Sequence, residues 1–77
     1  MKVRKIFFDS EEKKVFIHEN KKEEYIMVAI PELHWSIDFT YDEEDVQRKI
    51  YATLIGNIDE QEAEALSARI YQWTREM

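Results

Sequence analysis

The sequence predicts an α+β fold, an antiparallel meander of three or four strands followed by two C-terminal helices packed on one sheet face. Three observations lead to this class. Short segments rich in β-forming residues, separated by polar turns, fill the first half of the chain, and the second half changes to a helical period. The connections between the strand segments are too short for crossover helices, which favours antiparallel pairing. All 77 residues are expected to form one small domain.

The first three strand candidates are rich in β-branched and aromatic residues. They span residues 3–9, 13–18 and 24–30. Polar residues 9–12 form the first turn, and residues 19–23 form the second. Within the second turn, Asn20 is the residue expected to take a left-handed backbone conformation. Pro31 has no backbone N–H to donate and is therefore expected to end the third strand.

Residues 34–41 show the cleanest alternation of apolar and polar side chains in the chain. The apolar set that shares one side is Trp35, Ile37, Phe39 and Tyr41. This segment is the candidate for a fourth strand, and the sequence leaves open whether it pairs with the others.

A helical period begins after Tyr41, where Val46, Ile50 and Leu54 recur at intervals of four. The acidic residues 42–45 are placed in the first helical turn, where they would complement the positive end of the helix dipole. Gly56 is the only glycine of the chain and is expected to end this helix in a left-handed conformation.

Residues 59–77 predict a second, amphipathic helix. Its apolar residues recur every three or four positions, at Ala63, Leu66, Ile70, Trp73 and Met77. Asp59 is expected to cap the first free amides, with Glu62 reaching back to it and Ile58 as a hydrophobic staple. The two-residue joint at 57–58 makes the two helices antiparallel or steeply crossed neighbours.

Two helices can cover only one face of the sheet, whereas the predicted strands are apolar on both faces. The face assigned to the helices carries Ile6, Phe8, Val15, Ile17, Ile26, Val28, Ile30, Trp35, Ile37 and Phe39. The opposite face carries Val3, Phe7, Phe16, Tyr25 and Met27, interspersed with Lys5, Lys14, His18 and His34. Contiguous exposed apolar patches usually mark interaction sites, so this face predicts a homodimer or a bound partner protein. The alternative is that sheet twist and long lysine stems disperse these residues without a function.

The resulting hypothesis is a small protein-interaction or regulatory module. Its contacts would come from Phe7, Phe16, Tyr25 and Met27 on the uncovered sheet face. Tyr71 lies off the apolar stripe of the last helix, and with Gln72 and Arg75 it could form a second contact surface.

The charge distribution restricts the partners that the chain could bind. The formal net charge is −6, and the residues after Trp35 contain four basic and ten acidic side chains. An acidic protein repels phosphate backbones, so nucleic-acid binding is not expected. No apolar run is long enough to span a bilayer, and the chain contains no cysteine. A cytoplasmic protein without a membrane partner is expected.

A competing hypothesis is a small ligand- or metal-binding protein or an enzyme that uses His18, His34 and Asp38. Histidine and carboxylate side chains can ligate metals or exchange protons. Their spacing matches no metal motif, and one glycine cannot build a phosphate-binding loop. The sequence therefore assigns no cofactor, metal ligand or catalytic residue, and an enzymatic activity is not favoured.

Three segments resemble the YueH-like family of small Firmicutes proteins. They are residues 17–24 (IHENKKEE), 29–36 (AIPELHWS) and 68–77 (ARIYQWTREM). The resemblance, together with the length, covers most of the chain and implies a bacterial cytosolic source. It carries over no activity, cofactor or catalytic residue.

Overall fold

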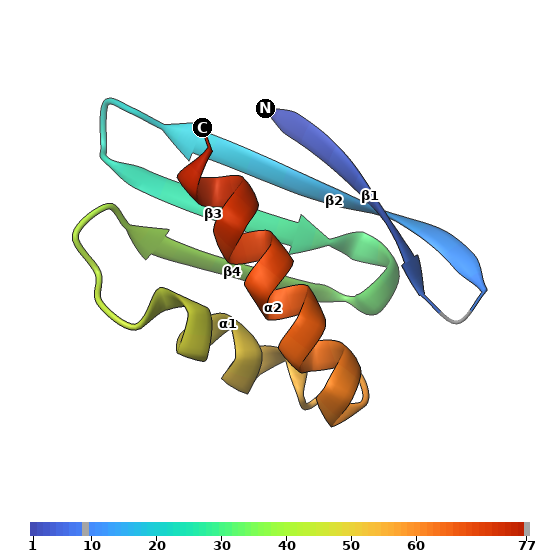
Figure 1. Ribbon diagram of the computed structural model, residues 1–77. Coiled ribbons are helices and arrows are strands. Elements are labelled where there is room, and N and C mark those ends of the chain that lie inside the picture. The colour runs from blue at the N-terminus through green and yellow to red at the C-terminus, as the bar shows by residue number, and fades with distance from the viewer. Residues whose placement is uncertain (9, 77) are drawn as a thin grey trace. The chain divides into compact units, whose positions relative to one another are not determined.

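The computed structural model describes residues 1–8 and 10–76 (Figure 1). Asp9, Met77 and the side chain of Phe8 lie outside the described part, and so do the predictions that concern them. The chain forms two compact units, residues 1–41 and residues 42–77. The assignment of the whole chain to a single domain stays a prediction.

The first unit is a four-stranded sheet in which each strand pairs with the next strand along the chain. Its strands are β1 (Lys2–Phe8), β2 (Glu11–Asn20), β3 (Tyr25–Ile30) and β4 (Trp35–Thr40), all antiparallel, in the order β1-β2-β3-β4 (Figure 1). A short 3₁₀ helix, η1 (Pro31–Leu33), joins β3 to β4. The α+β class and the antiparallel meander are confirmed, and the fourth strand does pair.

One face of this sheet is buried, and its residues are the ones that period-two alternation predicts. The apolar residues of this face with less than a tenth of their surface exposed are Ile6, Val15, Ile17, Ile26, Val28, Ile30, Trp35, Ile37 and Phe39. The pairing register places them side by side, because Ile17 lies opposite Val28 and Val28 lies opposite Ile37. The prediction of a buried, apolar face is therefore confirmed for these residues.

Lys13 is a charged residue on this buried face. It lies opposite Ile6 and is only 8% exposed. Its ammonium lies 3.4 Å from a carboxylate oxygen of Glu11 and 3.8 Å from one of Glu32. The aliphatic stem can therefore be buried while the charge stays paired. The Glu32 carboxylate also accepts the backbone N–H of Lys14 at 3.4 Å. A residue of η1 thus supplies a hydrogen-bond acceptor to the part of β2 that extends past the end of β3.

Two turn predictions are wrong in detail. Asn20 ends β2, and its side-chain oxygen accepts the backbone N–H of Glu23 at 3.0 Å. The left-handed residue of this turn is Glu24, with φ of 58°. His34 is also left-handed, with φ of 52°, and its N–H donates to the carbonyl of Pro31, so the last strand begins only at Trp35. In both turns a hydrogen bond accompanies a left-handed residue that is neither glycine nor asparagine.

The second unit contains α1 (Val46–Leu54) and α2 (Glu60–Arg75), which contact each other as the short joint predicts. Residues 42–45 precede α1, and its first turn contains no acidic residue, so their predicted place inside the first turn is wrong. Asp45 stands at the N-cap with φ of 55° and makes no side-chain cap. Glu43 instead pairs with Lys49 at 2.8 Å.

The end of α1 also differs from the prediction, because Gly56 does not take a positive φ. The carbonyl of Leu54 accepts the N–H groups of Asn57 and Ile58, at 2.8 and 3.1 Å. This turn satisfies the last carbonyl without a left-handed glycine.

At the start of α2, Asp59 caps the helix as predicted and accepts the N–H of Gln61 at 3.1 Å. The buried stripe of α2 is rotated relative to the prediction. It consists of Ala63, Leu66, Ser67, Ile70 and Thr74, whereas Trp73 is only partly buried. Ser67 and Thr74 can be buried because their hydroxyls donate to carbonyls one turn earlier in the same helix. Neither helix of the described chain is both long and apolar enough to cross a membrane.

Candidate functional site

The candidate interaction site is the sheet face opposite the buried one, here named the open face. Alternation along each strand and the pairing register define its members. They are Val3, Lys5, Phe7, Glu12, Lys14, Phe16, His18, Asn20, Tyr25, Met27, Ala29, Ser36, Asp38 and Thr40. The four residues predicted for interaction on the sheet, Phe7, Phe16, Tyr25 and Met27, all belong to this set.

The apolar side chains of the open face form a connected patch across three strands. Val3 lies opposite Phe16, and Phe16 lies opposite Ala29. Met27 is the next residue along β3 on the same face, diagonal to Phe16, within reach of large side chains. Phe7 is 78% exposed, Val3 50% and Met27 39%. The first unit therefore leaves large apolar side chains in water.

A basic spot interrupts this patch near β1. Lys5 lies directly opposite Lys14 on the open face. Lys5 has a partner, because its ammonium lies 3.5 Å from a carboxylate oxygen of Glu12. Lys14 makes no ion pair within the described residues. Like charges at directly opposite positions destabilise a sheet.

The residues of the competing ligand-site hypothesis do not come together. His18 and Asp38 lie in one row of the open face, with Met27 between them. His18 makes an edge-to-face contact with the ring of Tyr25, at 6.4 Å between centroids. His34 ends η1 and lies one strand length before Asp38, about 13 Å along extended backbone. Within the described residues, no cluster of three or more His, Cys, Asp or Glu could hold a metal.

Tyr41 follows β4 and forms hydrogen bonds with residues near the C-terminal end of β2. Its N–H donates to the carbonyl of Glu24 at 3.1 Å, and its hydroxyl donates to the carboxylate of Glu19. That hydrogen bond, with desolvation and the negative charges of Glu19 and Glu24, raises the pKa of Tyr41 to about 12. Tyr41 is 44% exposed. It therefore does not continue the buried row of Trp35, Ile37 and Phe39, although the alternation in the sequence predicts that it does.

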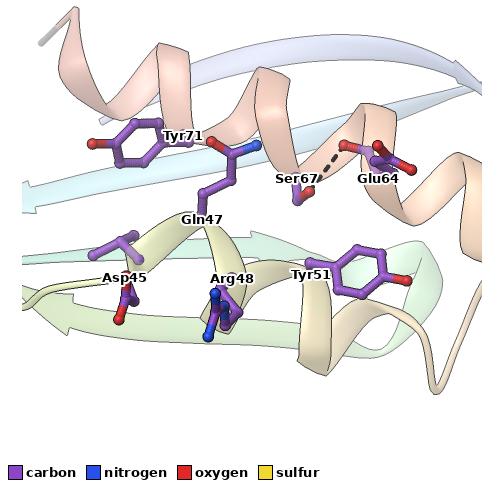
Figure 2. A pocket seen from close by; sticks show the side chains of 8 residues that line it. Asp45, Gln47, Arg48, Tyr51, Glu64, Ser67 and Tyr71 are labelled. Carbon is purple, nitrogen blue, oxygen red and sulfur yellow. Dashed lines mark hydrogen bonds between the residues drawn. The ribbon is translucent and has the colours of Figure 1, made fainter.

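The second unit contains a groove between α1 and α2, with a volume of about 550 Å³ (Figure 2). It is lined by Asp45, Val46, Gln47, Arg48, Tyr51, Glu64, Ser67 and Tyr71. Figure 2 shows Gln47 reaching from α1 toward α2, between Tyr71 and Ser67. Tyr71, predicted as a second contact residue, is thus part of a concave surface, and the Arg75 guanidinium lies 5.9 Å from its ring centroid.

The chemistry of the groove is mixed. The carboxylates of Asp45 and Glu64 line it together with the guanidinium of Arg48. Desolvation and the nearby carboxylates of Glu60 and Glu64 raise the pKa of Tyr51. Because both acidic and basic side chains line the groove, its charge does not favour an anionic ligand over a cationic one. The sequence does not predict the groove, because its two walls meet only when α1 and α2 pack. The sequence shows only that Arg48 and Tyr51, and likewise Glu64 and Ser67, are one helical turn apart and so share one face of their helix.

Comparison with known proteins gives a family for this chain. A family model described as YueH-like protein matches residues 2–76. A relative from Bacillus subtilis (strain 168), described as "Uncharacterized protein YueH", is 35% identical over 65 residues, which cover 82% of this chain and 79% of the relative. No solved structure matches the chain. The predicted resemblance is confirmed, and the relative's description assigns no activity.

Proposed function

This chain belongs to the YueH-like family, and we propose that it is a small protein-interaction module that binds through the open face of its sheet. The observation that carries the proposal is the exposure of Val3 and Met27 beside the partly buried Phe16, with the exposed Phe7 farther along β1 on the same face. Burying one large apolar side chain stabilises a complex by about 1.5–3 kcal/mol before the cost of association. A partner that covers this patch therefore gains affinity from several adjacent side chains.

The competing ligand or enzyme function receives less support from the geometry. It requires His18, His34 and Asp38 in one site, and the fold separates them along and across the strands. The groove between α1 and α2 contains none of these three residues. An exposed, partly apolar sheet face is suited to contact with another protein surface.

The first test of the proposal is the oligomeric state. We expect sedimentation equilibrium of the wild-type chain to show either a dimer or a monomer available for another partner. Phe16→Glu places a charge in the centre of the patch and should abolish any dimer. Ala65→Glu adds the same charge at an exposed position of α2 and should leave assembly unchanged.

The second arm of the test addresses a partner other than the chain itself. Wild type, Phe16→Glu and Ala65→Glu are used as baits in an extract of the cells that naturally make the protein. We expect a protein that wild type and Ala65→Glu retain and Phe16→Glu loses. Circular dichroism and a thermal melt check that Phe16→Glu folds, and Phe7→Gln, at a mostly exposed position, is the substitute if it does not. The proposal fails if no association, with itself or with another protein, depends on the open face.

A further inference from the structure

The strand β1 forms one outer edge of the sheet, because it pairs only with β2. An edge strand presents unpaired backbone N–H and C=O groups that can accept a further strand. The sequence of β1, KVRKIFF, contains three cationic residues and no acidic one. This edge therefore combines free backbone groups with a concentration of positive charge.

Arg4 of β1 and Lys14 of β2 lack full compensation within the described residues. Lys5 is directly opposite Lys14, and the ammonium of Lys14 makes no ion pair there. The Nε atom of Arg4 is buried and has no hydrogen-bond partner. A buried donor without a partner and a like-charge cross-strand pair both cost stability. Such local conflicts are expected at functional sites, where a ligand supplies what is missing.

The side chains of β1 also form a pattern that a partner strand can match. Val3, Lys5 and Phe7 lie on the open face, and Arg4 and Ile6 lie on the other face. Residues paired across two strands share a face, and oppositely charged or apolar pairs stabilise the sheet. A strand opposite Val3 to Phe7 would therefore carry, in that order, an apolar residue, two acids and two apolar residues.

We propose that an acidic, extended segment of another protein adds to the edge of β1 as a fifth strand, with one carboxylate beside Arg4 on one face and the next beside Lys5 on the open face. Lys14 lies on β2, one strand farther from this edge, and adds to the positive charge around Lys5. This proposal rests on the protein-interaction function above and specifies the partner. Charge complementarity selects this occupant over a second copy of the chain. Pairing β1 with another β1 would double the cationic side chains on one pair of strands, with no acid between them.

The test uses a designed probe because the natural segment is not identified. The probe is a fluorescein-labelled peptide with the sequence Thr-Val-Glu-Glu-Ile-Val-Thr, and fluorescence anisotropy measures its affinity for the full chain. We expect replacement of both glutamates by glutamine to weaken binding about tenfold, because each exposed ion pair changes affinity a few-fold. Lysine in both positions should abolish binding, and added salt should weaken only the acidic peptide.

Variants of the protein locate the peptide. Lys14→Glu should weaken binding a few-fold, because Lys14 lies one strand away from the added segment and acts through its charge. Lys22→Glu changes the charge of an exposed turn residue by the same amount and should have no comparable effect. Two further peptides carry N-methyl groups on alternate residues, one set on each edge of the strand. One of the two should lose binding, because strand addition uses the N–H groups of a single peptide edge.

The inference is overturned if no peptide binds, if the glutamine peptide binds as tightly as the acidic one, or if Lys14→Glu and Lys22→Glu act equally. It is also overturned if both N-methylated peptides bind like the parent peptide, which would indicate charge attraction without strand pairing. The Phe16→Glu experiment decides the interaction function separately, so an open-face partner can be found even when the acidic-strand inference fails.

Discussion

Removing two methyl groups from Val28 should destabilise the chain far more than truncating its neighbour Met27. Val28 is fully buried and lies between Ile17 and Ile37 in the register. Each buried methylene-sized group contributes about 0.8 kcal/mol, and the cavity left behind adds to the loss. Val28→Ala should therefore cost about 2–3 kcal/mol. Met27 points to the open face and is 39% exposed, so Met27→Ala should cost no more than about 1 kcal/mol.

Urea denaturation followed by circular dichroism measures both costs. A chain of 77 residues has a total stability of about 4–12 kcal/mol, so the Val28 loss is a large fraction of it. The melting temperature of Val28→Ala should fall by about 10–20 °C. Equal losses for the two variants, or a larger loss for Met27→Ala, would show that the faces of β3 are assigned wrongly, and with them the open face.

Two other predictions concern the ends of the sheet and of α2. The pKa of Tyr41 is raised to about 12, so its protonated, Glu19-bonded form stabilises the fold fully below the unfolded pKa near 10, and this contribution is lost as pH rises through 12. Absorbance titration at 295 nm should show that Tyr41→Phe removes the phenol that ionises last, and loss of an earlier-ionising phenol instead would exclude the Glu19 bond. Asp59→Ala should cost about 1 kcal/mol of unfolding free energy, because it removes the cap on the N–H of Gln61. Chemical denaturation measures this cost, and a change below 0.3 kcal/mol, on the order of the measurement error, would contradict the capping role.

The sheet could be predicted from the sequence because its information is local. In a half-buried strand the side-chain period is two, and shifting the pairing by one residue would move every apolar side chain to the wrong face. The pattern Trp35, Ile37 and Phe39 thus leaves one arrangement for β4. The cap at Asp59 was equally local, since it depends on one side chain and an amide two residues away.

The errors arose where residue type was taken to decide the backbone. Positive φ occurs at Ser10, Glu24, His34 and Asp45, whereas Gly56 does not use it. Hydrogen bonds such as that from His34 to Pro31 offset the strain at these positions, and no composition rule anticipates them. The stripe of α2 was misplaced for a related reason, because an intrahelical hydrogen bond lets Ser67 and Thr74 replace an apolar residue in the buried position.

The candidate site was predicted in part. Alternation alone identifies Phe7, Phe16, Tyr25 and Met27 as one face. The opposition of Lys5 and Lys14 requires the register between β1 and β2, which turn length sets and composition does not show. The groove between α1 and α2 around Tyr71 depends on how the two helices pack, which is harder to predict from the sequence than strand register.

The register makes Lys14 the residue that separates a stability role from a binding role. If Lys14 contributed to folding, its replacement would destabilise the sheet. Because it faces Lys5, the structure predicts the reverse: Lys14→Glu should stabilise the chain by about 0.2–1 kcal/mol as a like-charge pair becomes an ion pair. Urea denaturation at low salt measures the change, with Lys22→Glu as the matched control.

A Lys14→Glu variant that is more stable but binds the acidic peptide less well would show that Lys14 favours binding and lowers the free energy of unfolding. Proteins commonly lose stability at positions that serve binding, so the two effects should have opposite signs. A Lys14→Glu variant that is less stable than Lys22→Glu would instead make Lys14 a structural residue. The mismatch at the edge of β1 would then no longer support an acidic partner.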